Sequence, residues 1–190
     1  MRIAARCAYI AVVLFAAHLI ISFIPALHGA TFATAAGLAL ILAILALAQH
    51  GVVFPVAAML PAPGWARIAA YVWLIGDTVS DLMQLAGSPT QRYLALRLIV
   101  NVLAALWFVA ASWRAPMAMR IIGIFIGWDL VAYSLTGPFF PDASVILLPA
   151  LILVPIWFAL VGRQLSALAS KAAGDAGAKP QPAAKPANPS

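Results

Sequence analysis

The chain has 190 residues, of which 65% are hydrophobic and only 8% are charged, with a mean hydropathy of +1.05. A water-soluble domain carries about 25% charged residues, so this composition excludes a soluble globular protein and predicts an integral membrane protein in contact with the lipid bilayer. The net charge of +6 does not indicate nucleic acid binding, because the basic residues flank apolar segments and form no patch.

The apolar pattern predicts an all-α protein with six transmembrane helices in one domain, residues 1–170. The first two helices are expected over residues 3–28 and 31–49. The first begins beside Arg2 and Arg6, as a signal peptide would, but its apolar run exceeds the roughly 7–15 residues of a signal peptide and no clean cleavage site follows. We interpret it as a retained helix.

Residues 51–64 contain three prolines and are too few to cross a bilayer. They predict an interfacial or partly re-entrant connector, with an extension of the second helix as the alternative. The remaining helices are expected over residues 65–86, 90–113, 116–136 and 143–165. In the last one, Pro149 and Pro155 predict a kink.

Residues 171–190 are dominated by alanine, proline and glycine without apolar periodicity, which predicts a disordered cytoplasmic tail. The basic residues give the orientation, because cytoplasmic loops carry an excess of lysine and arginine. Only Arg92 and Arg97 lie nearer the outer side, against nine on the other: Arg2, Arg6, Arg67, Arg114, Arg120, Arg163, Lys171, Lys179 and Lys185. This bias predicts three hairpins with both termini in the cytoplasm, in the cell membrane or, in a Gram-negative bacterium, the inner membrane.

The third and fourth predicted helices carry most of the charge found within the spans. Folding the chain back at Pro89 brings together positions whose numbers sum to about 178, so Asp81 should face Arg97 and Asp77 should face Asn101. An unpartnered polar group in hydrocarbon costs several kcal/mol, so matched partners at equal depth are expected to pair.

Further polar residues are expected at the same depth in the outer half of the bilayer, with His18, Asp129 and Tyr133 as candidate binding residues beside Ser22, Thr78 and Ser80. Three aspartates, Asp77, Asp81 and Asp129, would then face one obligate cation, Arg97. Excess carboxylates in a low dielectric must either hold a proton or bind a cation, so the layer predicts a site for one of these. The alternative is that the polar pairs only fix helix packing.

The sequence contains no recognised catalytic, metal-binding or cofactor-binding motif and no glutamate. The leading hypothesis is therefore a small transporter or channel-like protein that binds a proton, a cation or a small molecule in this layer. An intramembrane enzyme acting on lipid and a structural subunit of a membrane complex are the alternatives. The substrate and the oligomeric state stay open.

Overall fold

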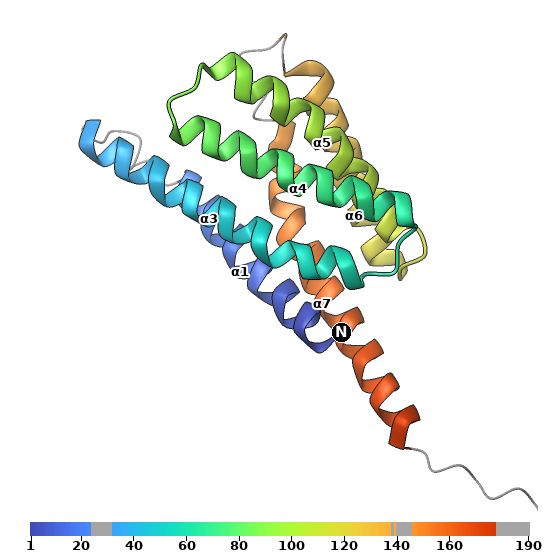
Figure 1. Ribbon diagram of the computed structural model, residues 1–190. Helices are drawn as coiled ribbons and strands as arrows, with labels where there is room; N and C mark the ends of the chain where they lie inside the picture. Colours follow the sequence, from blue (N-terminus) through green and yellow to red (C-terminus); the bar gives the residue numbers. More distant parts are fainter. Residues whose placement is uncertain (24–31, 138, 140–145, 178–190) are drawn as a thin grey trace, which may run out of the picture.

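The computed structural model describes residues 1–23, 32–137, 139 and 146–177, and the secondary structure in these residues is helical (Figure 1). The helices are α1 (Arg2–Phe23), α3 (Phe32–Met59), α4 (Gly64–Leu85), α5 (Thr90–Ser112), α6 (Met117–Thr136) and α7 (Leu148–Gly177).

Five of the described helices are long and apolar enough to cross a membrane: α1, α3, α5, α6 and α7. Helix α4 has 22 residues, but its polar residues, Asp77 and Asp81 among them, lower its hydropathy. The chain is a multi-pass α-helical membrane protein. Six spans in three hairpins, with both termini cytoplasmic, stay a prediction.

The helices form a closed ring in the order of the sequence. Each helix packs against the next one, from α1 through α3, α4, α5 and α6 to α7, and α7 packs against α1. Figure 1 shows α1 and α3 side by side, and α4 beside α5. The ring therefore has a centre onto which all six of the described helices can direct side chains.

Small residues allow the first and last helices to close the ring. The buried face of α1 consists of Ala4, Ala5, Ala8 and Ala11. On α7, a Cβ atom added at Gly162 would lie only 2.9 Å from the ring of Tyr9. Phe15 stacks on Phe158 with 5.4 Å between ring centroids. Such close approach is how membrane helices gain packing energy, because burial against lipid-like surroundings supplies little.

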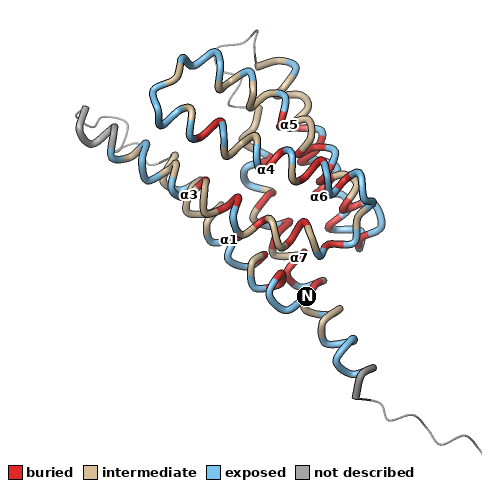
Figure 2. The backbone as a smooth tube through the Cα atoms, in the orientation of Figure 1, coloured by how far each residue is buried: buried red, intermediate tan, exposed pale blue. Residues whose placement is uncertain are grey.

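A cluster of five aromatic residues fills the bundle between α4, α5 and α7: Trp73, Trp107, Phe108, Trp157 and Phe158. The Trp157 indole N–H donates a hydrogen bond to the Ser112 hydroxyl at 2.8 Å. Figure 2 shows that buried and exposed positions alternate along the helices, because each helix turns one face to the bundle and another outward.

Helix α3 continues through Pro55 to Met59, so the predicted connector is wrong here and its alternative, the extended second helix, is confirmed. Pro55 has no N–H to donate to the carbonyl of Gly51, which costs the helix one hydrogen bond. Val53 and Val56 are fully buried around it, and this packing stabilises the helix across the proline.

Helix α7 is longer than expected at its carboxyl end. It runs through Pro155 without a break and reaches Gly177, so it includes the first residues of the segment expected to be a disordered tail. Alanine is the strongest helix former, and residues 167–173 are rich in it. Pro149 lies in the first turn, where proline is tolerated. The predicted kink stays a prediction, and residues 178–190 lie outside the described residues.

Candidate functional site

The turn between α4 and α5 sets the register of the charged residues. Gly87 has φ +72°, a left-handed conformation that favours glycine, and the Ser88 N–H donates to the Met83 carbonyl at 2.9 Å beyond it. The Ser80 hydroxyl also donates across the hairpin to the Tyr93 carbonyl at 2.7 Å. These bonds hold the two helices so that Asp81 lies opposite the following turns of α5.

Arg97 on α5 joins both aspartates of α4. Its Nη2 atom donates to Asp81 Oδ1, which confirms the predicted pair, and its Nε atom donates to Asp77 Oδ1 at 3.3 Å. No hydrogen bond links Asp77 to Asn101 in the part of the chain that the structure describes. The arginine side chain is long enough to span two carboxylates four residues apart, and its charged bonds are stronger than those of an amide.

His50 on α3 completes the cluster, although the sequence pattern does not predict it there. Its Nε2 atom lies 3.4 Å from Asp77 Oδ2, and its Nδ1 atom lies 3.8 Å from Asp81 Oδ2. The side chain is only 8% exposed. The prediction ended the second helix at Gln49, which placed His50 at the membrane surface. Because α3 runs on to Met59, nine residues further, His50 lies about 14 Å deeper than that end of the helix.

Both ring nitrogens of His50 face hydrogen-bond acceptors. The Thr78 hydroxyl donates its hydrogen to the Leu74 carbonyl at 2.7 Å, so it can only accept from Nδ1, which is 3.1 Å away. Nε2 faces the Asp77 carboxylate. An imidazolium ring satisfies both contacts, whereas a neutral ring has one N–H and satisfies one.

These residues line a cavity of about 260 Å³ at the centre of the ring. Its polar lining comes from four helices: His18, Ser22, Gln49, His50, Asp77, Asp81, Arg97 and Asn101. Its apolar lining includes the aromatic rings of Phe15, Trp73 and Phe108. Two buried atoms in this lining, His18 Nδ1 and Asp81 Oδ2, have no hydrogen-bond partner in the described structure.

His18 therefore lies in the cavity with the α4–α5 pairs, but Asp129 and Tyr133 are not among the lining residues. Asp129 accepts a hydrogen bond from the Ala150 N–H at 2.9 Å and so caps the first turn of α7. Asp129 and Tyr133 share one face of α6, and Leu130 on an adjacent face lines the cavity instead.

The capping contact leads to a stability prediction. Asp129→Leu should lower the free energy of unfolding by about 1–2 kcal/mol, because the Ala150 N–H loses its acceptor in a buried place. Asp129→Asn keeps an oxygen acceptor and should cost less. Thermal unfolding in detergent micelles measures both, and equal losses in the two variants would show that the charge of Asp129, not its acceptor atom, stabilises the bundle.

Comparisons with known protein families, with curated proteins and with solved structures find no match for this chain. Among the residues that the structure describes, no group of three or more His, Cys, Asp or Glu side chains is placed to hold a metal ion. The candidate site is thus a central cavity with two aspartates, two histidines and one arginine in an otherwise apolar bundle.

Proposed function

We propose that this chain is a small transporter or channel-like protein whose central cavity binds a proton or a cation. The observation that carries the proposal is the cavity itself, in which Asp81 Oδ2 and His18 Nδ1 are buried without a hydrogen bond to any described residue. A cluster that served only to hold helices together would be expected to satisfy its buried polar atoms. Ionisable residues inside membrane bundles commonly mark ion or proton pathways.

The charge balance of the cluster supports binding of a species with a single positive charge. Asp77, Asp81 and Arg97 sum to −1, and a protonated His50 brings the sum to zero. With His50 neutral, the cavity has room for one positive charge. The ionisable groups that face His50 in the cavity are His18 from α1, Asp77 and Asp81 from α4, and Arg97 from α5. Protonation of His50 and binding of a cation are therefore expected to compete.

The prolines within α3 and α7 fit this function. Pro55 leaves the Gly51 carbonyl without its usual helical donor, and Pro155 does the same for the Leu151 carbonyl. Leu151 lines the cavity. Both helices are continuous through their prolines, so each offers one carbonyl oxygen that is free to accept from a ligand.

Matched carboxylate variants test the proposal. Purified protein in liposomes that contain a pH-sensitive dye should conduct protons, or a monovalent cation, down an imposed gradient. Asp81→Asn, in the cavity, should lower this flux by about tenfold or more, which corresponds to only about 1.4 kcal/mol. Asp129→Asn, outside the cavity, should leave it unchanged.

Liposomes with wild-type protein that are as tight as protein-free liposomes to protons and to monovalent cations would contradict the proposal. A structural subunit of a membrane complex would then be the better hypothesis, since the bridge from Arg97 to two carboxylates also fixes the α4–α5 hairpin.

A further inference from the structure

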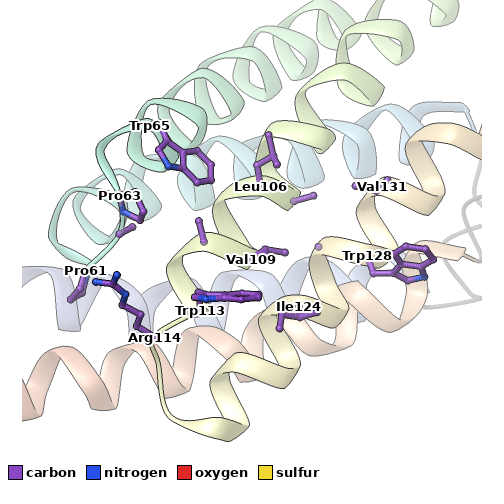
Figure 3. A pocket seen from close by; sticks show the side chains of 14 residues that line it. Pro61, Pro63, Trp65, Leu106, Val109, Trp113, Arg114, Ile124, Trp128 and Val131 are labelled. Atoms are coloured by element: carbon purple, nitrogen blue, oxygen red, sulfur yellow. The ribbon is translucent and has the colours of Figure 1, made fainter.

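A second hollow lies apart from the central cavity, on the surface of α5 and α6 that faces away from the centre of the helix ring. It is an apolar groove of about 940 Å³, and it shares no lining residue with the cavity. Figure 3 shows Pro61 and Arg114 at one end and Trp128 and Val131 toward the other. The groove is therefore long and directional, with one end at the connections between helices and the other within the bundle's apolar length.

Helices α5 and α6 pack closely through small residues, and these small side chains leave the groove beside the contact unfilled. A Cβ atom added at Gly127 would lie 3.1 Å from the Ala105 carbonyl oxygen, so these two backbones nearly touch. Small residues at this contact, together with Ala110, line the groove without filling it. Its walls carry the exposed rings of Trp65 and Trp113.

Among the described residues that line the groove, Arg114 is the only ionisable one. It is exposed, and it forms no ion pair with another residue in the described ranges. Leu106 also lines the groove and lies six residues before the end of α5 at Ser112, so the groove follows about 9 Å of the helix from the end near Arg114. The same end of the bundle carries Arg67 and Arg120, and the basic bias predicts that it is cytoplasmic.

We propose that this groove binds an anionic phospholipid, with one acyl chain along the apolar walls and the phosphate at Arg114. The arrangement matches the molecule, because an unpaired cation stands at the interfacial end of a hollow whose remaining lining is almost wholly apolar. Trp65 and Trp113 lie where interfacial aromatic residues contact headgroups. Basic pockets between transmembrane helices on the cytoplasmic side recognise anionic headgroups in this way.

The tryptophans make the site measurable. Three of the six, Trp65, Trp113 and Trp128, line the groove and are 56%, 62% and 73% exposed, whereas Trp73, Trp107 and Trp157 are buried. Brominated phosphatidylglycerol, titrated into phosphatidylcholine vesicles that contain the whole protein, quenches indole fluorescence on contact. The titration gives a binding constant for the anionic lipid relative to phosphatidylcholine.

Wild-type protein should prefer phosphatidylglycerol, and Arg114→Gln should lower this preference about fivefold, because the lipid phosphate loses its charged contact in the groove. Arg67→Gln is the matched control, since Arg67 is exposed at the same end but does not line the groove, and it should keep the preference. Ala110→Phe should fill the groove and reduce quenching by brominated lipids of both classes.

Three results would overturn the proposal. One is an unchanged preference in Arg114→Gln, and another is an equal loss in Arg67→Gln, which would reduce the effect to general surface charge. The third is a dimer in vesicles that dissociates in Ala110→Phe while lipid quenching persists, which would assign the groove to a second copy of the chain. None of these readouts depends on ion flux through the central cavity.

Discussion

Replacing Arg97 with methionine should lower the free energy of unfolding by about 3 kcal/mol or more, because Asp77 and Asp81 lose their shared counter-charge. The two carboxylates are 17% and 7% exposed, so water reaches them poorly. Arg97 itself is 31% exposed, which places the expected loss at the low end of the 3–5 kcal/mol typical for breaking a buried pair. Chemical denaturation in mixed micelles measures the loss.

A compensating variant distinguishes charge from shape. Asp77→Asn and Asp81→Asn combined with Arg97→Met remove all three charges at similar volume, and most of the lost stability should return. If the triple variant is no more stable than Arg97→Met alone, the loss comes from the packing of the arginine stem and not from unpaired charge.

Truncation of Trp157 to alanine should cost about 3–5 kcal/mol, the range for large aromatic residues in a packed core. The ring is fully buried between Trp107, Phe108 and Phe158, and its N–H bonds to Ser112 at 2.8 Å. Inside a membrane this stabilisation comes from packing contacts and not from removal of the ring from water. The cavity that the substitution leaves loses these contacts. Thermal unfolding followed by tryptophan fluorescence or circular dichroism reports it.

Trp128→Ala is the control for this variant. Trp128 is 73% exposed on the outer side of α6, where lipid can replace its contacts, so its loss should change the unfolding temperature little. Equal destabilisation by the two substitutions would show that the aromatic cluster contributes no more to stability than a tryptophan on the surface of the bundle.

Hydropathy and turn chemistry were sufficient to predict the α4–α5 hairpin and the pair between Asp81 and Arg97. Asp81 and Arg97 can be paired from the sequence because Pro89 and Gly87 mark the turn, and a turn at a known place fixes the register of two antiparallel helices. His50 was missed because a proline near a helix end was interpreted as a break, although buried neighbours carry α3 through Pro55.

Depth along a helix is readable from a sequence, but the direction in which each helix face points is not. Leu130 on α6 lines the cavity, but the rotation of that helix turns the neighbouring Asp129 toward the start of α7. Asn101 lines the cavity as its depth suggested, but the reach of Arg97 gives Asp77 a stronger partner. Side-chain length and helix rotation are set by the whole bundle and not by local spacing.

The closure of the ring between α1 and α7 has a consequence for biogenesis. During synthesis α1 is made before the other described helices, yet its final neighbour on one side is α7, the last of them in chain order. The cavity thus lacks one of its walls until α7 has been made. His50, Asp77, Asp81 and Arg97 belong to the consecutive helices α3, α4 and α5, so the nascent chain can compensate these charges among themselves before α6 and α7 arrive. Insertion of α7 then closes the cavity around charged side chains that already compensate one another.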